Sequence, residues 1–119
     1  GTGRRVALTS NTKDYRYSQY LSDWRSKVER IGAMNYPEEA RGKFFGSLVL
    51  SVALRPDGSV DRIIVVRSSG NKVLDESAKR IVMMSSPFAP FPPDIRKETD
   101  YLDITRTWNF TRGDALETR

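Results

Sequence analysis

The chain of 119 residues has no cysteine and no histidine. Their absence excludes disulfides, thiol nucleophiles, imidazole bases and the common zinc sites. The sequence also has no apolar run of about 18 residues and no signal-peptide pattern, so we expect the segment to be soluble. Apolar residues make up only 38% of the chain but gather in periodic runs. This composition predicts one domain with a modest core.

Catalytic patterns are missing as well. The turn-forming sequence Ser68-Ser69-Gly70-Asn71 is not followed by the Gly-Lys-Ser or Gly-Lys-Thr of a phosphate loop. The carboxylates show no pairing pattern, and a serine nucleophile without histidine would need a lysine at a recognised spacing. We therefore expect no enzyme activity, no cofactor and no metal.

The charge balance is basic, with a net charge of +5 and a pI near 9.7. Such a surface either attracts an acidic partner or is simply solvated. The basic residues are spread along the whole chain. Tyr101 alone does not form the aromatic platform that stacking on bases requires. We therefore expect no nucleic-acid partner.

The clearest structural pattern is a β-hairpin over residues 46–69. Apolar residues alternate along its first strand, and Pro56-Asp57-Gly58 has the composition of a tight turn with a bulge. If Arg55 faces Ser59, the predicted pairs are Leu54 with Val60, Val52 with Arg62, Leu50 with Ile64 and Leu48 with Val66. This register leaves Val49, Ile63 and Val65 on the back of the sheet.

Two helices flank this hairpin in the sequence. Residues 17–33 have apolar residues at helical spacing, with Ser18 as N-cap and Trp24 as a core anchor. Asn71 caps a second helix that Pro87 ends. Its buried stripe is predicted to comprise Leu74, Ala78, Ile81, Val82 and Ser85. The proline-rich residues 87–93 are either a ligand for an aromatic groove or a stiff connector whose two Phe side chains pack on the domain, and we favour the connector.

Residues 101–110 form the last predicted strand. Its apolar face comprises Leu102, Ile104, Trp108 and Phe110, and Arg106 falls on that face unless a bulge re-aims it. The fold class is therefore α+β, a three-stranded antiparallel sheet with two helices on one face, in the order helix-strand-strand-helix-strand. Residues 17–111 form the domain. Residues 1–16 are either poorly ordered or a short edge strand, and residues 112–119 form a flexible tail.

In this arrangement the last strand can lie only at an edge of the sheet. Its unpaired N–H and C=O groups invite the addition of a further strand. The occupant is either a partner peptide, the chain's own N-terminal segment or a dimer mate.

Several short blocks together resemble the TonB C-terminal domain family over residues 17–111. These blocks are Tyr36-Pro37-Glu38-Glu39-Ala40, Gly46-Ser47-Leu48-Val49-Leu50, Pro56-Asp57-Gly58-Ser59-Val60, Arg67-Ser68-Ser69-Gly70, Leu74-Asp75-Glu76-Ser77-Ala78 and Pro87-Phe88-Ala89-Pro90-Phe91-Pro92. They occur in the family's order. The closing residues 105–110 are similar to one branch of TonB paralogues.

The resemblance implies the periplasmic domain of a single-pass inner-membrane energy transducer. Such a domain binds the TonB box of outer-membrane transporters as an added strand. Energy from the proton-motive force reaches it through an ExbB/ExbD-like complex, which would contact a membrane helix and Pro-rich spacer upstream of this segment. A homodimer is also compatible with the family.

By the same resemblance, the partner peptide pairs with the last strand and lies near the segment before the hairpin. The implied contact residues are Tyr101, Asp103, Thr105, Arg106, Thr107 and Asn109, with Asn35, Tyr36 and Pro37 as a second group. The alternative function is a self-associating structural or assembly domain of the cell envelope, whose sheet edge pairs with itself.

Overall fold

The computed structural model describes residues 3–119, so the first two residues of the expected N-terminal segment lie outside the described part. It is an α+β fold around one mixed, five-stranded sheet. In chain order the elements are β1 (Arg5–Leu8), α1 (Tyr15–Met34), η1 (Glu38–Ala40), β2 (Gly46–Leu54), β3 (Val60–Arg67), α2 (Lys72–Ser85), α3 (Pro93–Arg96), β4 (Tyr101–Phe110) and β5 (Leu116–Thr118).

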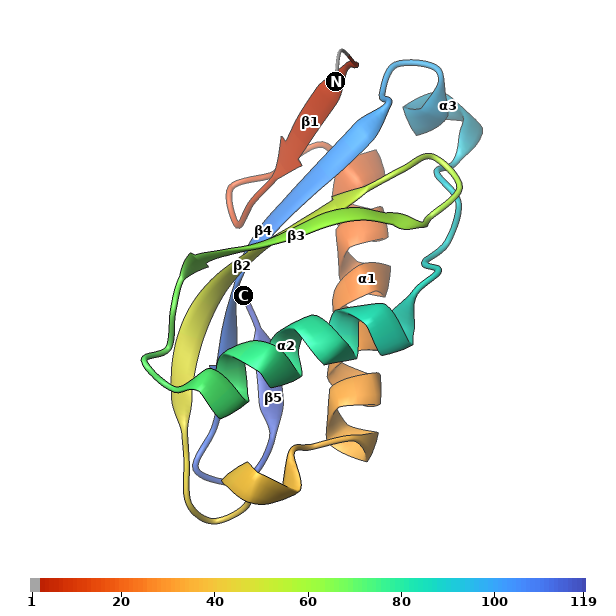
Figure 1. Ribbon diagram of the computed structural model, residues 1–119. Helices are drawn as coiled ribbons and strands as arrows, with labels where there is room; N and C mark the ends of the chain where they lie inside the picture. The colour runs from red at the N-terminus through yellow and green to blue at the C-terminus, as the bar shows by residue number, and fades with distance from the viewer. Residues whose placement is uncertain (1–2) are drawn as a thin grey trace.

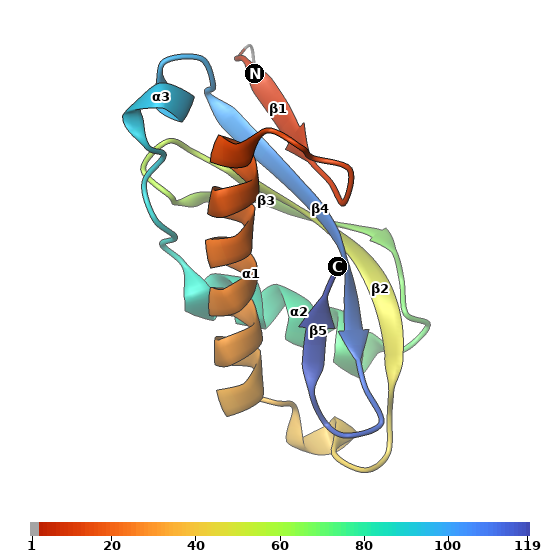
Figure 2. The same cartoon turned by 180° about the vertical axis from the view of Figure 1, so that it is seen from behind.

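The molecule has two layers, with α1 and α2 against the same face of the sheet (Figures 1 and 2). The strand order is β1-β4-β2-β3, and β5 pairs with the other half of β4. The even-numbered residues of β2 from Leu48 onward, and those of β4, are buried toward the helices, as their alternation predicts. The predicted fold class is thus confirmed, but the sheet has two more strands than expected because both chain ends join it.

The β2–β3 turn forms as predicted, with the Arg55 N–H donating to the Ser59 carbonyl at 2.9 Å and Leu54 facing Val60. Beyond the turn the predicted register is wrong. The structure pairs Val52 with Ile63, Leu50 with Val65 and Val49 with Arg67. Bulges next to Leu54 and Leu50 each add one residue to β3 and shift its pairing.

These bulges also reverse which face the β3 side chains occupy. Ile63 and Val65 pack against the core beneath the helices instead of lying on the back of the sheet. Ile64 and Val66 are the residues that remain exposed, at 43% and 58% of their surface. Val49 is half-buried on the open face.

The proline-rich segment is a connector, as we favoured. Phe88 and Phe91 are both buried in the core. Their backbone N–H groups donate to the carbonyls of Gly58 and Pro56, each at 2.9 Å. The segment therefore fastens the hairpin turn to the helix layer, and the short helix α3 follows it.

The long helix α1 begins two residues earlier than expected. Asp14 is its N-cap, not Ser18, because the Asp14 carboxylate accepts the Arg16 N–H at 3.0 Å. Trp24 is a core anchor as predicted, 2% exposed and edge-on to Trp108. Helix α2 has the predicted cap, Asn71, and all five residues of the predicted stripe are buried.

The C-terminal residues differ from the expected flexible tail. Thr111–Asp114 turn the chain back, and residues 116–118 pair with residues 108–110. Leu116 is buried, and the Thr118 N–H and hydroxyl both donate to the Glu29 carboxylate at 2.7 Å. These contacts with α1 order a segment that is polar overall.

Candidate functional site

The expected site is the last long strand, β4, whose backbone has two sides. One side pairs with β2 along its whole length, from Gly46 opposite Phe110 to Leu54 opposite Leu102. The other side, which we call the outer edge, faces away from the hairpin. The prediction that β4 lies at an edge of the sheet is wrong, because two further strands cover much of this outer edge.

Each end of the outer edge is paired with a different end of the chain. Residues 5–8 run parallel to residues 101–104, and residues 116–118 run antiparallel to residues 108–110. The Thr107 N–H and C=O each bond to the backbone of Arg119 at 2.8 Å. Figure 2 shows β1 beside the upper half of β4 and β5 beside its lower half. The sequence allowed three occupants of this edge: a partner peptide, the chain's own N-terminal segment or a dimer mate. In the structure the N-terminal segment, as β1, pairs with it.

Arginine side chains fasten β1 to β4. The Arg5 guanidinium donates two hydrogen bonds to the Asp103 carboxylate, both 2.9 Å, and its central carbon lies 4.4 Å from the centre of the Tyr101 ring. The Arg4 guanidinium contacts Asp100 with Nε–Oδ2 at 3.1 Å. These bonds from Arg4 hold the pKa of Asp100 below its ordinary value.

The predicted contact residues with odd numbers lie on the open face of the sheet. Their side chains are partly exposed and spaced along the strand; they are Tyr101, Asp103, Thr105, Thr107 and Asn109. The Thr105 hydroxyl donates to that of Ser51 at 3.1 Å, and the Ser47 hydroxyl donates to the Asn109 side-chain oxygen at 2.9 Å. This face can therefore offer polar contacts beside the backbone groups of the outer edge.

Arg106 lies on the opposite, helix-covered face, 6% exposed. Burial lowers its pKa, the nearby Arg25 lowers it further, and Glu29 raises it. Its guanidinium makes no hydrogen bond or ion pair with any residue in the range 3–119, and its Nε is buried without a partner. Arg106 and Thr105 occupy the gap between the stretches of β4 that β1 and β5 cover.

The second predicted group lies at the far end of β4 from Tyr101. Asn35 is exposed and caps α1 by bonding to the Ile31 carbonyl. Tyr36 is buried, with its ring edge-on to Phe110 at 5.8 Å between centroids. Pro37 is buried beside it. The structure thus brings this group to the β5 end of the outer edge, away from β1.

Sequence reasoning missed the residues that hold the outer edge closed at the β1 end. These are Arg4, Arg5 and Asp100. Arg4 bonds to Asp100, 96 positions away, and Arg5 bonds to Asp103, 98 positions away. The alternating residues near position 6 suggested a strand but not its partner. Two adjacent arginines ahead of this alternation, matched by Asp100 and Asp103 at the start of β4, were the available signal.

Other kinds of site have little support in the described residues. Across residues 3–119, no group of acidic side chains is arranged to hold a metal ion. None of the helices formed by these residues combines the length and the apolar character needed to cross a bilayer. A groove of about 510 Å³ lies along α1 and the connector and includes Trp24, Lys27 and Phe88.

Comparison with known proteins gives a matching family and a similar solved structure. The family model described as the C-terminal domain of Gram-negative bacterial TonB protein matches residues 32–111. The solution structure of the Helicobacter pylori TonB C-terminal domain is similar, with a TM-score of 0.55 and 21% identity, over 87% of this chain and 98% of that one. That likeness supports the fold alone. No curated protein matches the chain.

Proposed function

Because the chain belongs to the family of Gram-negative TonB C-terminal domains, we propose that it is the receptor-binding domain of an energy transducer. Domains of this family are periplasmic, and they are transducer and binding domains rather than enzymes. The partner is the TonB box of an outer-membrane transporter, which adds to the outer edge of β4 as an extended strand. The domain then passes on energy derived from the proton-motive force.

One observation carries this proposal: the outer edge of β4 already accepts added strands. It pairs with β1 in the parallel direction and with β5 in the antiparallel direction. These strands have only 4 and 3 residues, and within residues 3–119 neither pairs with another strand on its far side. An edge that pairs with short strands of the chain itself can pair with an extended peptide in their place, so it suits exchange of one occupant for another.

The arrangement of predicted contact residues fits this binding mode. Main-chain bonds to the outer edge provide affinity for any extended peptide, while the polar side chains on the open face can discriminate among sequences. Tyr36 and Pro37 flank the end that β5 now covers. A peptide replacing β5 would contact them, whereas one replacing β1 would contact Tyr101 and Asp103.

Amide NMR tests the proposal. A synthetic TonB box from an outer-membrane transporter of the same organism should shift the amide signals of residues 101–110. Thr107→Pro should abolish this response, because the Thr107 N–H points to the outer edge and proline lacks it. Thr107→Val keeps the N–H and is the matched control. Shifts confined to other regions, or equal binding by both variants, would contradict strand addition at β4.

The membrane connection is a further part of the proposal. In the full protein, a single inner-membrane helix and a Pro-rich spacer would precede this segment and link it to an ExbB/ExbD-like complex. The gene sequence upstream of residue 1 tests this directly. A full-length chain without a membrane-spanning helix ahead of the domain would contradict it.

A self-associating envelope domain is the second candidate function. The observation in its favour is the open side of β3, which no other strand among residues 3–119 covers. Ile64 and Val66 are exposed on this strand. Two copies could pair edge to edge there without displacing β1 or β5.

A further inference from the structure

We propose that the outer edge between Asp100 and Ile104 is a selective slot with a stated ligand chemistry. It takes an extended segment parallel to β4 that carries a basic residue and, three positions later, a large aliphatic residue. When no such segment is bound, residues 4–8 of this chain occupy the slot. The competing ligand is a segment of the outer-membrane transporter, and this identity rests on the proposed function.

The backbone of the slot fixes the direction and register of its occupant. The Arg4 carbonyl accepts the N–H groups of Asp100 and Tyr101 at 2.8 and 3.0 Å. Successive residues of a strand turn their backbone groups to opposite sides. Val6 and Leu8 therefore face β4, whereas Arg5 and Ala7 turn their N–H groups away from it.

The open face of the slot selects positive charge. Asp103 accepts two parallel hydrogen bonds from Arg5, the fork geometry in which arginine binds a carboxylate best. The Tyr101 ring lies against the same guanidinium. A carboxylate at the position of Arg5 would instead face Asp103, and like charges opposite each other on a sheet are unfavourable.

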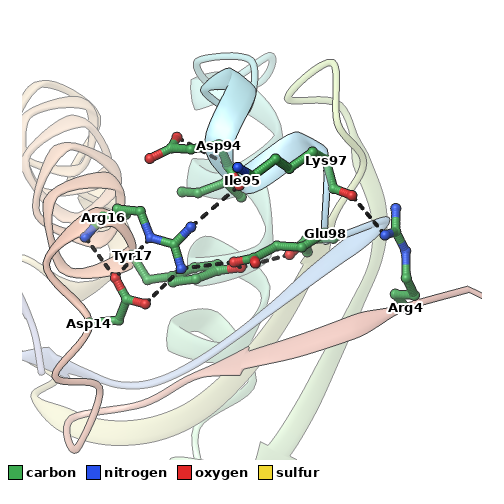
Figure 3. A network of polar contacts seen from close by, with 9 residues as sticks. Arg4, Asp14, Arg16, Tyr17, Asp94, Ile95, Lys97 and Glu98 are labelled. Atoms are coloured by element: carbon green, nitrogen blue, oxygen red, sulfur yellow. Dashed lines mark hydrogen bonds and ion pairs between the residues drawn. The ribbon is translucent and has the colours of Figure 1, made fainter.

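A second carboxylate extends this selection by one residue. Asp100 accepts the Arg4 backbone N–H at 2.7 Å and two bonds from the Arg4 guanidinium. The remaining guanidinium nitrogen donates to the Lys97 carbonyl at 2.8 Å, as Figure 3 shows. The two carboxylates and this carbonyl make the entrance of the slot a receptor for adjacent basic residues.

The helix-covered face of the slot selects an aliphatic side chain. Leu8 is 0% exposed and belongs to the hydrophobic core, opposite Ile104. Val6 is partly buried against the same core. An occupant without a large apolar side chain at the position of Leu8 would leave a cavity there. A large aliphatic side chain at this position is therefore the strictest requirement that a competing peptide must meet.

The present occupant can leave without unfolding the rest of the domain. The Arg4–Asp100 pair is exposed and contributes little to stability, so the partly buried Arg5–Asp103 pair and the buried Leu8 side chain are the main contacts that its release must break. Helix α1 keeps separate anchors at its start: Arg16 pairs with Asp14 at 2.8 Å and with Glu98 at 2.9 Å (Figure 3). Residues 9–13 lie between these anchors and β1, so they can act as the hinge.

The test uses two proline variants of the full chain. Val6→Pro removes an N–H that faces β4 and should release β1, whereas Ala7→Pro removes an N–H that faces solvent and is the matched control. The probe is a blocked hexapeptide with the sequence of residues 4–9, Arg-Arg-Val-Ala-Leu-Thr. It should bind Val6→Pro at least about tenfold more tightly than Ala7→Pro and shift the amides of residues 101–105.

Altered probes test the two selection rules. Replacing the second arginine of the probe by glutamate, or its leucine by serine, should each weaken binding to the Val6→Pro variant by about tenfold or more. Equal binding of the glutamate probe would overturn charge selection. Equal binding of the probe to both proline variants, with β1 released only in Val6→Pro, would overturn the slot itself. If Val6→Pro loses its helical circular dichroism, the double variant Arg4→Ala/Arg5→Ala replaces it.

Competition separates this inference from the proposed function. A TonB box peptide that shifts β4 but does not compete with the hexapeptide would overturn the slot as its site and leave the proposed function intact. A hexapeptide that binds Val6→Pro while no TonB box binds either protein would retain the slot's chemistry but overturn the transporter as its ligand. A wild-type dimer that the hexapeptide dissociates would assign the slot to a second copy and overturn the transporter assignment.

Discussion

Arg106 is an unusual residue for the interior of a small domain. Its guanidinium sits beneath α1 near Arg25 and Glu29, yet it has no hydrogen-bond or ion-pair partner among residues 3–119. Removing a charge from water without pairing it is unfavourable, and apolar side chains of similar volume often replace buried charges with a gain in stability. We therefore expect Arg106 to lower the stability of the isolated domain.

We expect Arg106→Met to raise the free energy of unfolding by about 1–2 kcal/mol. Methionine has a similar length and can fill the same space without a charge to desolvate. Urea denaturation measures the change. Arg62→Met, on the exposed part of β3, is the control and should change stability by less than about 0.5 kcal/mol. A less stable Arg106→Met protein would contradict the assignment of Arg106 as a destabilising residue.

At the scale of elements, the contact between the hairpin turn and the proline-rich connector depends on one glycine. Gly58 has φ +84°, and a Cβ atom there would overlap the Phe88 carbonyl. Gly70 has nearly the same φ, +83°, but open space around it. The two positions therefore share the cost of a left-handed backbone and differ only in the close approach.

Gly70→Ala should destabilise the protein by about 1 kcal/mol, the cost of the left-handed conformation. Gly58→Ala should cost clearly more, about 2–4 kcal/mol, because the turn must also move away from the connector. Thermal or urea denaturation of both variants measures the difference. An equal loss of stability in Gly58→Ala and Gly70→Ala would mean that the turn and the connector are not tightly packed against each other.

Sequence reasoning succeeds where a pattern lies within a single helix or strand. Strict alternation in β2 and β4, and the capped stripe of α2, predicted buried faces correctly because each pattern is read within one element. The β3 register was missed because a bulge adds a residue without changing composition. The occupant of the outer edge of β4 was left open because the pairing of β1 with β4 joins residues far apart in the sequence, such as Arg5 and Asp103, 98 positions apart. The site residues could be placed on β4, but their neighbours could not.

For the whole molecule, we expect a monomer whose mass by light scattering does not depend on concentration. The long strand β4 is paired on both sides, which leaves β3 as the longest open edge in the described part. Two bulges distort that edge, and Arg62 and Arg67 on it make no ion pair among residues 3–119. Bulges and unpaired charges oppose edge-to-edge association. A mass that doubles with concentration would instead favour the self-associating function.

The packing of α1 on β4 also has an optical consequence. The chain's two tryptophans, Trp24 and Trp108, meet there with ring centroids 6.1 Å apart and planes at 79°. Both are buried, and neither indole N–H has a hydrogen-bond partner in the described residues. Their excited states therefore couple in a buried and chiral arrangement. Near-ultraviolet circular dichroism and emission from this pair report any shift of α1 relative to β4 without an added label.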